Sequence, residues 1–199
     1  MIDEFLDLKS GINLVYGEAA SGKTTLALML AYNYSKFSKV IFIDTENGFN
    51  FERFKQIAKD DYEACLRNIL LYKVKSFDEQ YKIVKNLSNL NKIGLIILDT
   101  LGMYYRLELK NDVKDINNKV SEMLNIFISL YKKGTKILIN NQVYKNFENN
   151  KLESVGGNMV KKLCKFIVKL ERDPRKIIRE KPGNHERLFV IKDGGIILK

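Results

Sequence analysis

The stretch Gly17-Glu18-Ala19-Ala20-Ser21-Gly22-Lys23-Thr24 has the spacing G-x-x-x-x-G-K-[ST] of a loop that binds phosphate groups. An apolar run over residues 12–16 precedes it, and the good helix formers of residues 26–31 follow without Gly or Pro. We therefore expect a buried strand, a glycine loop and a helix in this order, which is the context that the motif requires. Because glycine has no Cβ, Gly17 and Gly22 let the backbone turn sharply and approach a ligand closely.

Each part of this loop has a chemical role in the expected site. The backbone N–H groups of the loop and of the first helical turn converge on one point and favour an anion there. The Lys23 ammonium supplies a cation for the β- and γ-phosphates, and the Thr24 hydroxyl can bind Mg²⁺. The sequence thus predicts a site for ATP and Mg²⁺. Its predicted nucleotide-binding residues are Gly17, Glu18, Ala19, Ala20, Ser21, Gly22, Lys23, Thr24 and Thr25.

Length and composition indicate a globular protein that lies in the cytoplasm. The chain has 199 residues, of which 45% are hydrophobic and 29% charged, so that it can form one domain with a full core. No apolar run approaches 18 residues, and the acidic start of the chain lacks a signal-peptide pattern. Two cysteines, Cys65 and Cys164, form neither a disulfide framework nor a metal-binding spacing, and we expect both to be buried.

The net charge of +10 favours a polyanionic partner such as DNA or RNA. The alternative is a lysine-rich composition without functional meaning, since Lys, Ile and Asn are plentiful throughout the chain. His185, the single histidine, is expected at the surface. A basic run near the C-terminus either contacts nucleic-acid phosphates or belongs to a solvated hairpin loop. Its members are Arg172, Arg175, Lys176, Arg179 and Lys181.

Apolar runs alternate with helical periodicity along most of the chain. Besides residues 12–16, strands are expected over residues 40–43, 69–74, 95–98 and 137–139, and helices over residues 51–58, 77–90 and 112–132. The last helix has one apolar stripe, formed by Val113, Ile116, Val120, Met123, Phe127 and Leu130. This alternation predicts an α/β fold with a doubly wound, mostly parallel sheet.

The pattern changes near the C-terminus. Short strands are expected over residues 166–170, 188–191 and 196–198, with turn signals at residues 182–184 and 193–195. They predict antiparallel strands at the edge of the sheet. Because no linker interrupts the pattern, we expect a single domain over residues 1–199.

Polar side chains follow three of the expected strands. Asp99 ends the strand of residues 95–98, where a P-loop ATPase needs an acid for the Mg²⁺ shell. Glu46 follows the strand of residues 40–43 and is the candidate to activate a water molecule for hydrolysis, with a turn or capping carboxylate as the alternative. Gln142 follows the strand of residues 137–139 and can hydrogen-bond the γ-phosphate, unless it is an ordinary loop residue.

Four blocks, in order along the chain, resemble those of the RecA-type recombinase ATPases, and most closely those of archaeal RadB, the short paralogue of RadA. The resemblance covers nearly the whole chain and implies a RecA-like P-loop ATPase core. The blocks are the Walker A loop at 17–24, IDTENGFNFER at 43–53, LIILDTLGMYYR at 95–106, and NQV at 141–143 followed by GGN at 156–158 and LER at 170–172.

The resemblance implies roles for further residues. Glu46 becomes the water-activating carboxylate, Gln142 the sensor of the γ-phosphate, and Lys23 part of the catalytic set. Arg53 and Gln56 would line the adenine, on which a guanidinium plane stacks well. The segments at 103–113 and 143–155 would face DNA.

The family resemblance also implies a function and partners. We expect an ATP- and DNA-binding protein that is accessory to homologous recombination and repair, hydrolyses ATP weakly, and has weak or no strand exchange. The DNA would be single- or double-stranded and bound without sequence preference. Recombination proteins such as RadA, or a Holliday-junction resolvase, are candidate protein partners, and no membrane is involved.

Two departures from the family pattern keep alternatives open. Sixteen residues precede the loop, so that we expect no N-terminal helix-hairpin-helix domain, and no Phe-x-x-Ala segment for filament contacts occurs before Gly17. One alternative is a signalling ATPase of the KaiC type, whose partners are proteins. The other is a non-hydrolysing nucleotide switch, in which ATP binding reshapes the DNA-facing segments.

Overall fold

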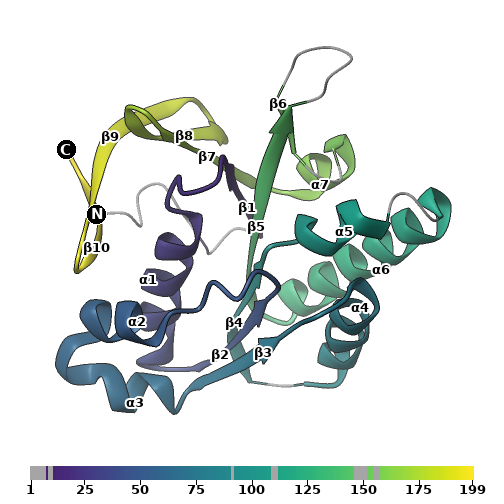
Figure 1. The fold of residues 1–199 in the computed structure, drawn as a ribbon. Coiled ribbons are helices and arrows are strands. Elements are labelled where there is room, and N and C mark those ends of the chain that lie inside the picture. Colours follow the sequence, from purple (N-terminus) through teal and green to yellow (C-terminus); the bar gives the residue numbers. More distant parts are fainter. Residues whose placement is uncertain (1–7, 9–10, 91, 109–111, 146–151, 155–156) are drawn as a thin grey trace.

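The computed structural model describes residues 8, 11–90, 92–108, 112–145, 152–154 and 157–199, and its centre is a large twisted sheet (Figure 1). Six strands run parallel. In spatial order they are β7 (Phe166–Arg172), β1 (Ile12–Gly17), β5 (Lys136–Lys145), β4 (Ile93–Asp99), β2 (Lys39–Asp44) and β3 (Ile69–Lys73). The predicted parallel α/β sheet is thereby confirmed.

Antiparallel strands extend this sheet beyond β7, as predicted for residues 188–191 and 196–198. They are β8 (Arg175–Lys181), β9 (His185–Lys192) and β10 (Gly195–Leu198), while β6 (Leu152–Ser154) pairs separately with β5. The strand of residues 166–170, which was also expected to be antiparallel, is β7 and runs parallel to β1, so that part of the prediction is wrong. The basic run lies mostly on β8, so the alternative of a solvated hairpin loop is wrong for it. Its strand forms because it pairs with β7 and β9 on both sides and buries Ile177.

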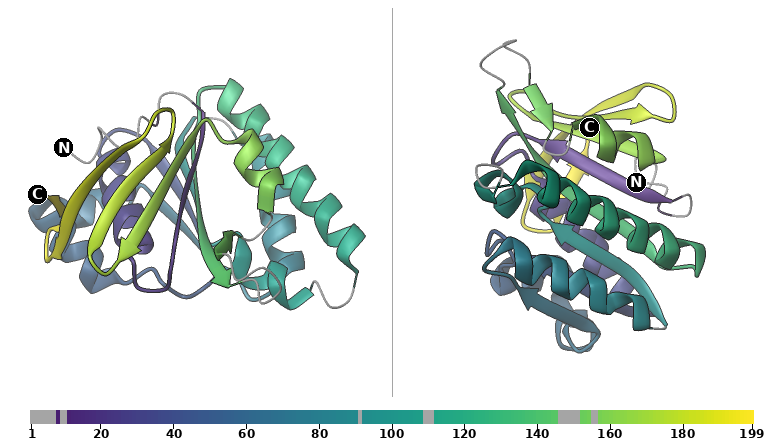
Figure 2. Two further views of the ribbon diagram at one scale, coloured as in Figure 1. Left: turned by 90° about the horizontal axis from the view of Figure 1, so that it is seen from above. Right: turned by 90° about the vertical axis from the view of Figure 1, so that its right-hand side faces the viewer.

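Helices cover the two faces of the sheet separately (Figure 2). One face carries α1 (Lys23–Ser35), α2 (Phe51–Ala58) and α3 (Tyr62–Leu66), with a 3₁₀ turn at Lys59–Asp61. The other carries α4 (Phe77–Asn86), α5 (Gly102–Glu108), α6 (Val113–Lys132) and α7 (Gly157–Leu163), with a 3₁₀ turn at Leu87–Asn89. The C-terminal strands β9 and β10 lie over α1, on the first face.

Each face of the sheet has its own hydrophobic core. Along β2, Val40 and Phe42 pack on the face of α1, whereas Ile41 and Ile43 pack on the face of α6. A strand that is buried on both faces reads as a continuous apolar run, which is why residues 40–43 were predictable. Full burial of a side chain such as Phe42 contributes roughly 1.5–3 kcal/mol to folding.

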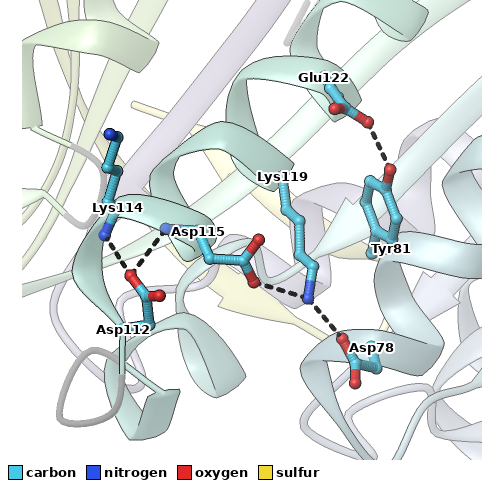
Figure 3. Close-up of polar contacts among 7 residues, drawn as sticks. All are labelled: Asp78, Tyr81, Asp112, Lys114, Asp115, Lys119 and Glu122. Carbon is cyan, nitrogen blue, oxygen red and sulfur yellow. Dashed lines mark hydrogen bonds and ion pairs between the residues drawn. The ribbon is translucent and has the colours of Figure 1, made fainter.

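The long helix α6 buries most of its predicted apolar stripe. Val113, however, is 53% exposed, because it is the first helical residue and lies outside the core of that face. Polar contacts join α6 to α4 (Figure 3). Lys119 Nζ lies 3.0 Å from Asp78 and 2.9 Å from Asp115, and the Tyr81 hydroxyl donates to Glu122.

Two further expectations concern individual side chains and the membrane. Cys65 and Cys164 are both buried free thiols, and burial raises the pKa of Cys164 to about 12, which makes this thiol unreactive. His185 is exposed, as predicted. Within the part of the chain that the structure describes, no helix combines the length and the apolar character that crossing a bilayer requires.

Candidate nucleotide-binding site

Strand register brings the predicted polar residues to one edge of the sheet. Asp44 at the end of β2 lies beside Asp99 at the end of β4, and Asp99 lies beside Asn140 of β5. Gln142 of β5 is the register partner of Gly17, the last residue of β1. Since the carboxyl ends of parallel strands meet at the same edge, residues from four separate segments converge on the start of α1.

The glycines of the loop occupy positions where a side chain does not fit. A Cβ on Gly17 would lie 2.2 Å from the backbone oxygen of Leu170 on β7 and 2.8 Å from Ser21 Oγ. Gly22 has φ 108°, a conformation that glycine adopts far more easily than other residues. Both positions therefore require glycine, which confirms the structural context predicted for the loop.

The N-terminus of α1 differs from that of three other helices. Asn50, Ser76 and Asp112 cap α2, α4 and α6 by accepting hydrogen bonds from backbone N–H groups of the first turn. At α1 the N-cap is Gly22, and among the described residues no side chain caps the helix and no acid lies in its first turn. The free N–H groups and the positive end of the helix dipole favour an anion at this point.

Lys23 lies at the base of the loop and is 6% exposed. Its Nζ donates to the backbone oxygens of Gly17 at 2.9 Å and Glu18 at 2.7 Å. Burial lowers the pKa of Lys23, while the carboxylates of Asp99 and Glu46 oppose this shift. The ammonium is therefore enclosed within the site and oriented by the loop itself.

Asp99 is almost fully buried, and one of its oxygens, Oδ2, has no hydrogen-bond partner among the described residues. Burial, together with the nearby carboxylates of Glu46 and Asp44, raises the pKa of Asp99 to about 6, although the polar side chains of Thr24 and Asn140 oppose the shift. An unpaired buried carboxylate oxygen next to a threonine hydroxyl fits a Mg²⁺ ion, which prefers oxygen ligands.

The described residues contain no group of three or more His, Cys, Asp or Glu that could hold a metal alone. The ion would therefore be shared between Thr24, Asp99 and the phosphate oxygens of a bound nucleotide, as in P-loop enzymes, which bind Mg²⁺ together with the nucleotide.

Glu46 is held by two neighbours at the mouth of the site. Its Oε1 accepts from Thr100 Oγ1 at 2.8 Å, and the Gln142 side-chain amide donates to Oε1 at 2.7 Å and to Oε2 at 2.8 Å. Asp44 shapes the turn that carries Glu46, because it accepts from the backbone N–H groups of Gly48 and Phe49, both at 2.9 Å. Asp44 thus holds the backbone of this turn through hydrogen bonds, whereas Glu46 is exposed and belongs to the pocket at the loop.

The segment at 103–113, which resemblance suggested as a DNA-facing loop, is largely helical. Helix α5 occupies Gly102–Glu108, and α6 begins at Val113. Tyr105 fixes α5 to α6 by donating to Asn117 at 2.8 Å. Arg106 of α5 donates to Gln142 Oε1 at 3.5 Å, so that this segment touches the residue that holds Glu46. The segment at 143–155 lies mostly outside the described residues.

A pocket of about 220 Å³ opens at the loop and combines most of the predicted residues. Gly17 and Glu18 instead line a neighbouring cleft of about 490 Å³, and Ser21 is buried beneath the loop. The residues that line the smaller pocket are Ala19, Ala20, Gly22, Lys23, Thr24, Thr25, Glu46, Asp99, Gln142 and Ile191.

Arg53 and Gln56 lie next to this pocket, at the hairpin of β9 and β10. Arg53 donates from Nη1 to Gln56 Oε1 at 3.0 Å and from Nη2 to the backbone oxygen of Lys192 at 2.6 Å. Ile191, the residue before Lys192, lines the pocket and was not predicted. The turn signal at 193–195 indicated the hairpin, but no local pattern in the sequence indicates that it packs against the loop.

Arg175 and Lys176 of the basic run make contacts within the chain. Arg175 Nη1 donates to the backbone oxygens of Ala20 at 3.1 Å and Ser21 at 3.4 Å. Lys176, the next residue on β8, pairs with Glu186 at 3.2 Å. Arg175 is therefore a neighbour of the phosphate loop, which its position in the sequence did not suggest.

Comparisons with known proteins agree with this geometry. A family model described as Rad51 matches residues 6–197. The DNA repair and recombination protein RadB of Methanococcoides burtonii is 36% identical over 86% of this chain and 80% of its own length. The protein of that name from Methanococcus maripaludis is 33% identical over 98% of this chain and 96% of its own. A crystal structure of the RadB recombinase superposes with a TM-score of 0.81 at 26% identity, covering 98% of this chain and 94% of the other.

Proposed function

The chain belongs to the Rad51 family, and we propose that it is an ATP- and DNA-binding accessory protein of homologous recombination and DNA repair that hydrolyses ATP slowly. One arrangement supports ATP as the ligand. The uncapped N-terminus of α1, Lys23 and Asp99, which has an unpaired carboxylate oxygen among the described residues, line one pocket. An anion that carries Mg²⁺ complements all three features.

In this proposal, different residues of the chain have different roles in ATP hydrolysis. The loop and Lys23 bind and orient the phosphates, and Thr24 and Asp99 would hold the Mg²⁺ ion, which neutralises charge on the phosphoryl oxygens. Glu46 accepts the proton of the attacking water, and Gln142 orients Glu46 through its amide. Arg53 and Ile191 would contact the base, which is supported by the bond of Arg53 to the β9–β10 hairpin and by the position of Ile191 at the pocket.

A DNA partner is supported by charge and by the comparisons. The net charge of +10 attracts a polyanion, and the relatives carry the name DNA repair and recombination protein. The contact of Arg106 with Gln142 suggests how a ligand on α5 would affect turnover. Movement of α5 would change the hydrogen bonds that hold Glu46.

Titration of labelled single- and double-stranded DNA, with and without ATP and Mg²⁺ and at two salt concentrations, tests this proposal. We expect sequence-tolerant binding whose affinity falls steeply with salt, because each phosphate contact releases a counterion, with a log–log slope of about −0.9 per duplex contact. If neither DNA binds at low salt in the presence of ATP and Mg²⁺, the recombination role is wrong. The result would favour a KaiC-type ATPase with protein partners.

One observation favours a nucleotide switch as the second candidate function. Both carboxylate oxygens of Glu46 already accept hydrogen bonds from Gln142, which competes with the binding of a water molecule. In a switch, ATP binding alone would change the DNA affinity. A steady-state rate of phosphate release that stays at the level of a Lys23→Ala control would support the switch over the enzyme.

A further inference from the structure

Arg175, the first residue of β8, reaches across to the phosphate loop although 155 positions separate it from Ala20. Its guanidinium donates through Nη1 to two consecutive carbonyl oxygens, those of Ala20 and Ser21. Arg175 is half-buried; its hydrogen bond to Ala20 is exposed and the one to Ser21 is partly buried. Hydrogen bonds from a charged donor are stronger than those between neutral groups.

The two carbonyls belong to the part of the loop with the least favourable backbone conformation. Ala20 has φ 60°, in the left-handed region that residues other than glycine rarely adopt, and Gly22 has φ 108°. A non-glycine residue persists in this region only when its surroundings hold it there. Arg175 provides such a restraint, because it binds the carbonyls on both sides of the Ser21 backbone.

The direction of these carbonyls determines where the adjacent N–H groups point. In a trans peptide the C=O of one residue and the N–H of the next point in opposite directions. Since the Ser21 carbonyl points to Arg175, the N–H of Gly22 points away from it, at the start of α1. Two other loop carbonyls, those of Gly17 and Glu18, are bound from within the loop by Lys23.

From this geometry we infer that Arg175 is a positioning residue for nucleotide binding, which orients the loop so that the Gly22 N–H binds phosphate, while the Ser21 N–H donates within the loop to the Glu18 oxygen at 3.3 Å. The inference rests on the proposed function, because it requires that the loop binds ATP. Arg175 acts through the loop and touches no phosphate itself. The contact of Arg175 with the loop also joins the antiparallel extension of the sheet to the loop, since Arg175 lies on β8.

Lys176 provides a matched control. It is adjacent to Arg175, carries the same charge, and pairs with Glu186 on β9 instead of contacting the loop. Lys176→Met and Arg175→Met therefore remove one positive charge each from the same strand, but only Arg175→Met removes the hydrogen bonds to the loop. Arg175→Lys keeps the charge and replaces the planar guanidinium by one ammonium group, so it should retain part of the wild-type affinity.

The experiment measures the affinity of the full chain and these three variants for ATP and for inorganic triphosphate, both with Mg²⁺, together with their thermal unfolding. We expect Arg175→Met to weaken both ligands about tenfold, Arg175→Lys to weaken them less, and Lys176→Met to bind both like the wild type. The unfolding temperatures of Arg175→Met and Lys176→Met should agree.

Other results overturn the inference. Wild-type affinity in Arg175→Met, or an equal loss in Lys176→Met, would show that the loop does not depend on this contact. A loss of affinity with a matching fall in unfolding temperature confined to Arg175→Met would show a merely structural role. A change in the salt dependence of DNA binding without a change in ATP affinity would make Arg175 a DNA contact. If the wild type bound neither ligand, the proposed function would fail together with this inference.

Discussion

The side-chain amide of Gln142 donates to both carboxylate oxygens of Glu46, at 2.7 Å and 2.8 Å, although 96 positions separate the two residues. One follows β2 and the other lies on β5, so this contact joins two segments of the site across the end of β4. The orientation of the Glu46 carboxylate therefore depends on Gln142. Substitution at either residue should lower the rate of ATP hydrolysis more than it lowers the affinity for ATP.

Glu46→Gln should retain ATP affinity and lower the rate of hydrolysis by about a hundredfold or more, because an amide cannot accept the proton of the attacking water. Gln142→Ala is expected to lower the rate less, since it leaves the carboxylate in place but unrestrained. Phosphate release and ATP binding should be measured separately. Unchanged turnover in Glu46→Gln would mean that another group is the base.

Lys23→Ala should weaken ATP at least about tenfold, because it removes a charged donor from the phosphates. The fold should remain intact, since among the described residues the hydrogen bonds of Nζ go to the loop carbonyls of Gly17 and Glu18. Calorimetric titration with ATP and a thermal unfolding curve of the same sample test both statements. Retained ATP affinity in a folded variant would contradict the assignment of the phosphate loop.

Arg53→Ala should weaken ATP by about 1 kcal/mol through lost stacking on the base, and should weaken inorganic triphosphate far less. The structure adds a second effect. Arg53 also donates to Lys192, so the variant is expected to loosen the β9–β10 hairpin and to lower the unfolding temperature slightly. Equal losses for both ligands would mean that Arg53 acts on phosphate or only through folding.

Asp99→Asn tests the raised pKa of Asp99. Because burial raises this pKa to about 6, the folded protein holds a proton that the unfolded chain has already released, and stability falls as the pH rises through 6. In Mg²⁺-free buffer the wild type should therefore lose about 1–2 kcal/mol between pH 5 and pH 7.5 relative to Asp99→Asn. Denaturant unfolding at both values measures this difference, and a constant difference would show that Asp99 ionises normally.

The effect of Mg²⁺ on ATP affinity should have the opposite pH dependence to that of stability. The ionised carboxylate is the form that binds a cation, so Mg²⁺-dependent ATP affinity is expected to fall below pH 6 in the wild type. The variant Asp99→Asn should show weak Mg²⁺ dependence at every pH. Equal Mg²⁺ dependence in both proteins would place the ion elsewhere.

Local signals in the sequence predicted the elements that carry the site. The bounds of α2 agree with the prediction because Asn50 caps the helix through its own side chain, which is a contact over three residues. The convergence of Glu46, Asp99 and Gln142 was predictable because each comes shortly after one of the apolar runs that form neighbouring strands of one parallel sheet. The regular register of parallel strands places these three residues at the same edge of the sheet.

Contacts between residues far apart in the sequence could not be predicted from local sequence patterns. The strand β8 is rich in charge, and it forms because β7 and β9 pair with it on both sides. Helix α5 lies where a loop was expected, and its position depends on the contacts of Tyr105 and Arg106 with other elements. Arg175 and Ile191 reach the phosphate loop only through the fold of the C-terminal hairpins.

The contact between Arg175 and Ala20 also has a consequence for synthesis of the protein. A ribosome that adds about 5–20 residues per second needs roughly 10–30 s to proceed from the loop to the strand that holds it. During this interval the nascent chain contains its complete phosphate motif without the guanidinium that orients the motif or the Ile191 side chain that lines the pocket. In the proposed function, ATP would therefore stabilise this protein fully only after the late strands have emerged and docked.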